Sequence, residues 1–166
     1  MRVLWAPWRL SYVSRPEAES GCIFCDKPRE TTREGRRDNL VLRVTEHAAV
    51  MMNLFPYANA HVLVSPRGHS ADFASLDGRT LAELQSELQS VVRALTRAFA
   101  PGGFNIGLNL GRAGGAGIAD HLHWHVVPRW IGDTNFMPML ADTRVMPDHL
   151  ANTYDRLLPY FEDERR

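Results

Sequence analysis

The chain has 166 residues, of which 45% are hydrophobic and 23% charged, as in an ordinary globular protein. Its 19 basic and 19 acidic residues balance, which excludes the broad basic surface that non-specific nucleic-acid binding requires. No stretch approaches the roughly 20 apolar residues that cross a bilayer, and the start lacks the apolar core and cleavage site of a secretion signal. We therefore expect a cytoplasmic protein with one domain, residues 1–166, that binds neither membranes nor nucleic acid.

Residues 1–37 are expected to form an ordered arm and loop ahead of the main body of the domain, residues 38–166. The large rings of Trp5 and Trp8 predict that the arm packs on the domain, with the lining of a substrate pocket as the alternative. The charged run 29–37 has neither strand nor helix periodicity, so we expect an exposed loop there.

Five short segments have the composition of β-strands, because they are rich in aliphatic residues and are bounded by turns. The first two are separated by a polar Thr45-Glu46 step, which is typical of a hairpin. The expected strands are residues 39–44, 47–53, 61–65, 104–110 and 121–127.

Between the third and fourth of these strands, apolar residues recur at spacings of three and four, which predicts one long helix. Ser75 or Asp77 is available as its N-cap, and Pro101-Gly102-Gly103 would end it. A last helix is expected to open at Pro147. The apolar residues that these two helices would bury are Leu81, Leu84, Leu88, Val91, Val92, Leu95 and Phe99, then Leu150, Leu157, Leu158 and Phe161.

Three histidines alternate in the last expected strand, at His121, His123 and His125. Alternate side chains of a strand share a face, so these imidazoles should project together. A single buried histidine usually only satisfies a hydrogen bond. Three in register instead favour a site for a nucleophile, a proton carrier or a metal.

A glycine-rich loop, residues 111–117, comes directly before the histidines. Glycine lets a ligand approach backbone N–H groups closely, as an anionic phosphate would require. Its position next to the histidines favours phosphate binding over a merely flexible connection. Both cysteines of the chain, Cys22 and Cys25, form a Cys-x-x-Cys pair, which in a cytosolic protein indicates metal or redox chemistry before a structural disulfide.

The stretch His121-Leu-His-Trp-His-Val-Val127 resembles the signature of the histidine triad (HIT) family. The Cys-x-x-Cys pair and residues 59–66 and 127–129 extend the similarity over most of the chain. Residues 4–9 and 103–111 are similar to a bacterial branch that includes diadenosine tetraphosphate phosphorylases. The resemblance implies an α+β fold, with an antiparallel sheet of about five strands, one long helix and a C-terminal helix. It also implies a homodimer with a continuous sheet, since an uncovered edge strand invites pairing.

The resemblance assigns nucleotide chemistry to the triad. His123 would attack the α-phosphorus of an adenine nucleotide or dinucleoside polyphosphate and hold the nucleotide covalently. Its other ring nitrogen then needs an acceptor, for which a main-chain carbonyl is expected. His125 would contact a phosphate oxygen or the bridging oxygen, and His61 would line the same pocket, so that their donors oppose the charge developing at phosphorus. Asn109 would face the leaving phosphate, with a turn-forming asparagine as the alternative.

The resemblance also places a nucleoside pocket at the first strands. Ile23, Phe24 and Met51 would surround the base, and Asn53 would bind the ribose. Core packing is an equally good explanation for Phe24 and Met51. Gly117 is also expected at the nucleotide, where relatives commonly carry a glutamine or serine that positions the acceptor of the bound nucleotide. Because glycine has no side chain, this position favours neither water, which would make a hydrolase, nor phosphate, which would make a phosphorylase.

In Cys-x-x-Cys members of the family, two histidines complete a zinc site. Here they are His69 and His121, which with Cys22 and Cys25 would form a closed tetrahedral shell for structural zinc. A thioredoxin-like use of the cysteines is the alternative.

Two further hypotheses stay open at this point. One is a nucleotide-binding regulatory module without significant turnover. The other is a catalytic zinc hydrolase in which the three triad histidines hold the metal.

Overall fold

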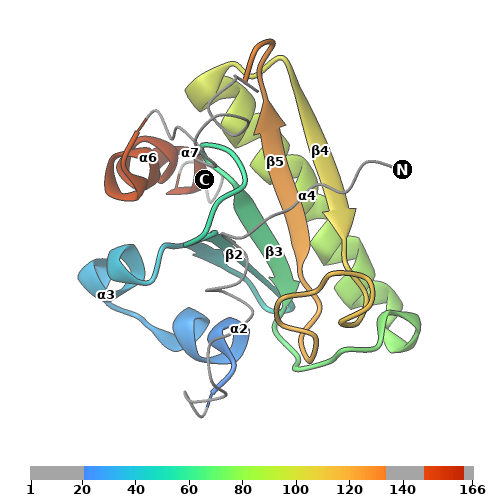
Figure 1. Ribbon diagram of the computed structural model, residues 1–166. Helices are drawn as coiled ribbons and strands as arrows, with labels where there is room; N and C mark the ends of the chain where they lie inside the picture. Colours follow the sequence, from blue (N-terminus) through green and yellow to red (C-terminus); the bar gives the residue numbers. More distant parts are fainter. Residues whose placement is uncertain (1–20, 134–147, 163–166) are drawn as a thin grey trace, which may run out of the picture.

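The computed structural model describes residues 21–133 and 148–162, and it contains a five-stranded sheet in which every neighbouring pair is antiparallel (Figure 1). The strand order is β1-β2-β3-β5-β4, which leaves β1 and β4 at the edges. This confirms the expected α+β fold. Trp5 and Trp8 lie outside the described residues. The strands are β1 (Val41–Val44), β2 (Ala48–Met52), β3 (Val62–Pro66), β4 (Gly103–Leu108) and β5 (Trp124–Arg129).

The long helix α4 (Gly78–Phe99) lies against one face of the sheet, as expected (Figure 1). Of the two candidate N-caps, Asp77 serves, since its carboxylate accepts hydrogen bonds from the N–H groups of Arg79 and Thr80. The helix ends at Ala100, a non-glycine residue with φ 46°. None of the described helices is long and apolar enough to cross a membrane.

The C-terminal segment forms two helices where one was expected, α6 (Leu150–Leu157) and α7 (Pro159–Glu162). Pro159 has no N–H to continue the hydrogen-bond ladder of α6, which accounts for the break. The expected start at Pro147 lies outside the described residues. Leu157 and Phe161 are fully buried against α4 and the sheet.

Residues 29–37 are not buried, as expected, but the prediction of a loop there is wrong. A helix, α3 (Arg33–Asp38), begins after Thr32, whose hydroxyl caps the N–H of Gly35. No residue of α3 is buried, so no apolar periodicity could reveal it. The other short helices among the described residues are α2 (Ile23–Asp26) and the 3₁₀ turns η2 (Lys27–Arg29) and η3 (Phe73–Ser75).

Two apolar clusters lie on opposite faces of the sheet, because neighbouring strand residues point to opposite sides. The larger cluster joins the sheet to α4, α6 and α7 and includes Val50 and Val62. The smaller one places Phe24 of α2 over Met51 and Leu63. The second face also carries the histidines.

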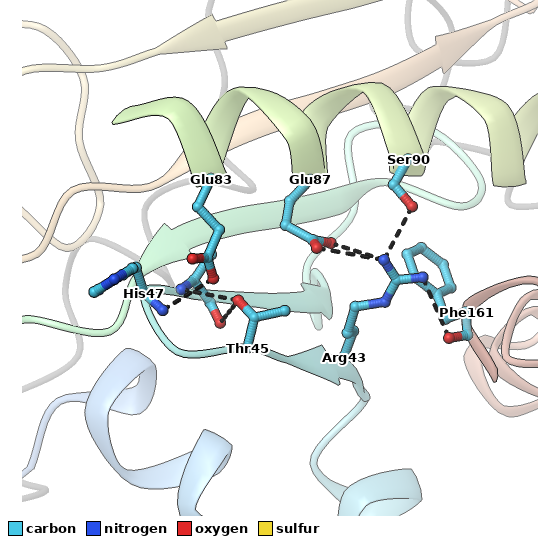
Figure 2. Close-up of polar contacts among 8 residues, drawn as sticks. Arg43, Thr45, His47, Glu83, Glu87, Ser90 and Phe161 are labelled. Carbon is cyan, nitrogen blue, oxygen red and sulfur yellow. Dashed lines mark hydrogen bonds and ion pairs between the residues drawn. The ribbon is translucent and has the colours of Figure 1, made fainter. Parts of the chain in front are cut away.

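A buried arginine fastens the first hairpin to the helical layer. The Arg43 guanidinium donates to Glu87 (3.3 Å) and Ser90 (3.2 Å) on α4, and to the main-chain oxygen of Phe161 (3.2 Å) (Figure 2). One turn earlier on α4, Glu83 accepts the N–H of His47 in the hairpin turn (3.0 Å). The Arg43 and Glu87 side chains are only 10% and 8% exposed, so the pair is shielded from water.

Removing one partner of a shielded ion pair leaves the other charge buried. We expect Glu87→Ala to lower the free energy of unfolding by about 3 kcal/mol, measured by urea denaturation. Ser86→Ala, on the exposed neighbouring position of α4, should change it by less than about 0.5 kcal/mol. Equal losses in both variants would contradict a stabilising role for the pair.

Candidate active site and metal centre

The candidate site lies on the sheet face opposite α4, where β3 and β5 run side by side. His125 on β5 is paired with Leu63 of β3 and Gly107 of β4. His61 directly precedes β3 and has no exposed surface. The strand register therefore brings His61 and His125 together, although 63 residues separate them in the chain.

The expectation that all three triad histidines share one strand face needs correction. Strand β5 begins at Trp124, so His121 and His123 precede it. The N–H of Leu122 is bound to the carbonyl of Ser70, outside the sheet ladder. As a result, His123 lies beside His125, with ring centroids 5.0 Å apart, whereas His121 faces the cysteines.

His123 is held as one tautomer. Its Nδ1 lies 2.8 Å from the main-chain oxygen of His121, which can only accept, so Nδ1 carries the proton. This carbonyl is the kind of acceptor expected from the sequence. The unprotonated Nε2 has no hydrogen-bond partner among the described residues, and it therefore presents a lone pair.

Hydrogen bonds also fix the tautomers of His61 and His125, in a chain that begins at the main-chain N–H of Tyr57. The main-chain N–H of Tyr57 donates to Nδ1 of His61 (3.1 Å), so Nε2 of His61 carries the proton. That Nε2 lies 3.0 Å from Nδ1 of His125, which must accept. The proton of neutral His125 is thus on Nε2, a buried atom without a hydrogen-bond partner among the described residues.

Burial keeps these imidazoles neutral. Desolvation, followed by the neighbouring histidine charges, lowers the pKa of His61 to about 3. Desolvation and the nearby His123 lower the pKa of His125 to about 4. Desolvation also lowers the pKa of His123. At neutral pH the site therefore holds uncharged rings, with one nitrogen lone pair on His123 beside one N–H donor on His125.

The low pKa of His61 predicts that acid destabilises the fold. In the unfolded chain this histidine binds a proton below about pH 6.5, but in the folded chain only near pH 3. Stability present above pH 6.5 is therefore lost as the pH falls, by up to about 1.4 kcal/mol per pH unit for this residue.

Urea denaturation of wild type and His61→Asn between pH 4.5 and 8 would measure this effect. The pH slope of the variant should be smaller by up to about 1.4 kcal/mol per unit below pH 6.5 and equal above it. Parallel slopes over the whole range would show that His61 is not held neutral.

Four candidate metal ligands gather next to the triad. Nδ1 of His121 lies 3.2 Å from Sγ of Cys22 and 3.5 Å from Sγ of Cys25, and Nδ1 of His69 lies 3.3 Å from Sγ of Cys25. All four ligand atoms lie within 4.8 Å of one another. Nε2 of His121 donates to the carbonyl of Pro66 (2.9 Å), which leaves its Nδ1 lone pair towards the thiols.

This donor set fits a tetrahedral zinc ion, with two sulfur and two nitrogen ligands. Within the described ranges it is the one His/Cys/Asp/Glu group that could hold a metal, and it contains neither His123 nor His125. The geometry therefore favours a structural site over the hypothesis of a catalytic zinc held by the three triad histidines.

The chain is similar to known proteins in both sequence and fold. The HIT domain family matches residues 34–130, more than half of the chain. A Mycobacterium tuberculosis protein named AP-4-A phosphorylase is 34% identical over 158 residues, covering 90% of this chain and 79% of that protein. The chain belongs to the HIT family.

Further relatives and solved structures that resemble the chain are also HIT proteins. An uncharacterized HIT-like protein of Mycoplasma genitalium is 32% identical, over 67% of this chain and 74% of its own. Among solved structures, a hypothetical histidine triad nucleotide-binding protein of Sulfolobus tokodaii is 25% identical with a TM-score of 0.67, and covers 87% of this chain and 95% of its own. A Zn-bound histidine triad family protein of Mycobacterium smegmatis, 24% identical over the same shares of the two chains, has a TM-score of 0.66 and shows the same fold.

The glycine-rich loop of this HIT protein is a compact turn. Gly115 has φ 90°, a conformation that only glycine adopts readily, and Nδ2 of Asn109 lies 3.4 Å from its carbonyl oxygen. This contact favours the turn-forming alternative for Asn109. Gly117 is exposed and brings no side chain to the site.

The four expected nucleoside contacts differ in exposure. Ile23 is 38% exposed, whereas Phe24 and Met51 are 1% and 2% exposed. Their burial favours the core-packing alternative for Phe24 and Met51. The Asn53 amide is engaged within the HIT fold, since Oδ1 accepts the N–H of Phe55 and Nδ2 lies 3.2 Å from Nδ1 of His61.

Tyr57 is a site residue that the sequence analysis missed. Its ring stacks on His125 at 5.5 Å with an interplanar angle of 16°, and it contacts His61 at 4.7 Å. The segment around Tyr57 has turn composition, which hides this role. An aromatic residue four positions before His61 was the one signal available.

Proposed function

We propose that this protein cleaves the α-phosphate bond of adenine nucleotides, such as diadenosine polyphosphates, through a nucleotide bound covalently to His123. The observation that carries the proposal is the juxtaposition of the His123 Nε2 lone pair and the unpartnered Nε2–H of His125. A nucleophile beside a preorganised donor is the combination that phosphoryl attack requires. The identity of 34% to a protein named AP-4-A phosphorylase supports this substrate class.

In the proposed first step, Nε2 of His123 forms a bond to the α-phosphorus, and the bond from phosphorus to the bridging oxygen breaks. The leaving group departs with that electron pair. The Nδ1–H of His123, bound to the His121 carbonyl, stabilises the positive charge that develops on the attacking ring. The Nε2–H of His125 donates to the phosphate or bridging oxygen, where negative charge grows.

His61 acts through His125. Its Nε2–H donates to Nδ1 of His125 and so keeps the single N–H proton of that neutral ring on Nε2, which faces the substrate. Neutral rings suit the proposed reaction, because a protonated His123 would have no lone pair with which to attack.

The nucleoside is proposed to lie near Ile23 and Asn53. Ile23 offers exposed apolar surface for the base. Asn53 retains one lone pair on Oδ1 and one N–H for the ribose hydroxyls, in addition to its bonds inside the protein. We propose Asn109 as a contact of the leaving phosphate through its second Nδ2–H, because only one of the two is directed to the Gly115 carbonyl.

We propose zinc as the metal of the Cys22/Cys25/His69/His121 site. When bound there, it would supply a cross-link rather than chemistry, since four protein ligands leave no position for substrate. A thioredoxin-like dithiol is less consistent with two histidine nitrogens within hydrogen-bond range of the sulfurs.

Product analysis tests the proposed function. Purified protein is incubated with diadenosine tetraphosphate, with and without inorganic phosphate, and the products are separated by chromatography. A phosphorylase would release ADP and ATP only when phosphate is present, and a hydrolase would release AMP and ATP in either case. Binding without any turnover would instead support a regulatory module.

We also propose a homodimer formed through the β4 edge. Ile106, in the middle of this edge strand, is 49% exposed, and no strand of the described ranges pairs with the outer side of β4. A groove runs beside it along α4. The residues that line this groove are Gln85, Leu88, Gln89, Val92, Arg93 and Ile106.

Placing a charge at the centre of that edge should separate the subunits. We expect Ile106→Glu to raise the dimer dissociation constant roughly 30-fold or more, measured by sedimentation velocity. Ile131→Glu, at an exposed isoleucine beyond the end of β5, is the control and should leave dimerisation unchanged. A wild-type protein that is monomeric at micromolar concentration would contradict the proposal.

A further inference from the structure

His121 contacts both the cysteines of the candidate metal site and His123, the proposed nucleophile. Its ring directs Nδ1 to the cysteine sulfurs, at 3.2 Å from Cys22 and 3.5 Å from Cys25. Its main-chain oxygen accepts the Nδ1–H of His123 at 2.8 Å. One residue therefore connects the candidate metal ligands to the nucleophile of the proposed reaction.

Phe24 makes a second connection between the two centres. It lies between the two cysteines in the chain, and its ring stacks on His123 with centroids 4.7 Å apart and an interplanar angle of 23°. The same ring contacts His121 at 5.3 Å. Phe24 is 1% exposed, so it touches the nucleophile from inside the protein.

The helix that carries Phe24 has little stability of its own. Helix α2 has four residues, and its N-cap residue, Cys22, makes no side-chain capping bond. A single helical turn is unstable in isolation, because nucleation costs more than one turn of hydrogen bonds returns. The position of Phe24 therefore depends on its burial and on whatever holds Cys22 and Cys25.

We infer that the Cys22/Cys25/His69/His121 site is a positioning device for the His123 imidazole. Ligation of this set would fix the peptide of His121 and the ring of Phe24, and these two groups hold His123 as the Nδ1–H tautomer with Nε2 towards the substrate. This inference deepens the proposed function, because it rests on His123 as the nucleophile. It assigns Phe24 as a positioning residue rather than a contact of the base.

The other two histidines provide an internal reference. The tautomers of His61 and His125 are set by the N–H of Tyr57 and by the bond between the two rings, and neither contact involves α2. Loss of the metal should therefore change His123 and leave His61 and His125 as they are.

Nuclear magnetic resonance of ¹⁵N-histidine-labelled protein reads the tautomers directly, at one fixed neutral pH. In zinc-loaded protein, His123 should show one protonated Nδ1 and one unprotonated Nε2. After chelation, its two nitrogen shifts should move towards each other, as the tautomers average, while the His61 and His125 shifts stay. A His123 pattern that does not change on chelation would overturn the inference.

The zinc-loaded Phe24→Leu variant tests the same inference without removing metal, and it decides the matter if chelation unfolds the protein. Zinc content should stay at the wild-type level while the His123 tautomers average. With a dinucleoside polyphosphate substrate, kcat should fall ~10–100-fold and KM should change less than about threefold. The matched control is Arg29→Ala, which removes an exposed ion pair at the end of the same segment and should leave the His123 spectrum and both constants unchanged.

An unchanged His123 spectrum in the Phe24→Leu variant would exclude Phe24 as a positioning residue. The nuclear magnetic resonance experiments need no turnover. A protein that cleaves no nucleotide, but whose His123 tautomer follows the metal, would refute the proposed function and leave the positioning role in place.

Discussion

Replacing His123 with alanine should reduce the cleavage of diadenosine tetraphosphate by more than about 10⁴-fold, because the variant lacks the atom that bonds to phosphorus. Nucleotide affinity, measured by calorimetry, should stay within about threefold of wild type, since Ile23 and Asn53 are untouched. Binding and chemistry would thus separate.

Two further variants sharpen that test. His125→Ala removes a donor rather than the nucleophile, so its loss should be smaller, ~10²–10³-fold. His149→Ala replaces an exposed histidine at the start of α6 and should have wild-type activity. Turnover of His123→Ala that equals or exceeds that of His125→Ala would contradict the assigned roles.

Removal of the metal from the Cys22/Cys25/His69/His121 site is also expected to have a large effect, on stability. The purified protein should carry about one zinc per chain, and chelation should lower the free energy of unfolding by about 2–4 kcal/mol, or the melting temperature by roughly 5–15 °C. This loss resembles that of a covalent cross-link, because the ligands join α2 to segments 44 to 99 residues away. It is smaller than in zinc-finger peptides, since the sheet has its own core.

The Cys22→Ser variant provides the control for chelation. It should lose zinc and melt at the temperature of the chelated wild type, and a chelator should not lower that temperature further. Zinc affinity should also fall in acid, because protons compete for thiolate and imidazole. Zinc that stays bound in Cys22→Ser, or a melting temperature that chelation leaves unchanged, would exclude this ligand set.

The sheet and the long helix could be predicted because their residues obey short-range rules. Each strand is a short aliphatic segment between turns, and α4 combines a regular apolar stripe with an N-cap at Asp77. Helix α3 escaped prediction because it buries nothing, and its one clear signal is the cap at Thr32. The break between α6 and α7 was not predicted, because the apolar pattern continues past Pro159, although this residue has no N–H with which to extend a helix.

The sequence predicted which residues form the candidate site better than it predicted how these residues are arranged. The four metal-ligand candidates converge as the family resemblance implied. The departure of His121 from the strand was not predictable, because it depends on a long-range bond from Leu122 to Ser70. The tautomers of His61 and His125 depend on the N–H of Tyr57, a backbone group with no signature in the sequence.

His123 is proposed to become covalently bonded to the nucleotide during turnover, and this adduct can be trapped. Wild-type protein is mixed with labelled diadenosine tetraphosphate, quenched rapidly without acid, and digested for peptide mapping by mass spectrometry. We expect an acid-labile, base-stable adenylyl group on the peptide that contains His123, and none in His123→Ala. An adduct on another residue, or turnover by wild type without any adduct at His123, would contradict this mechanism.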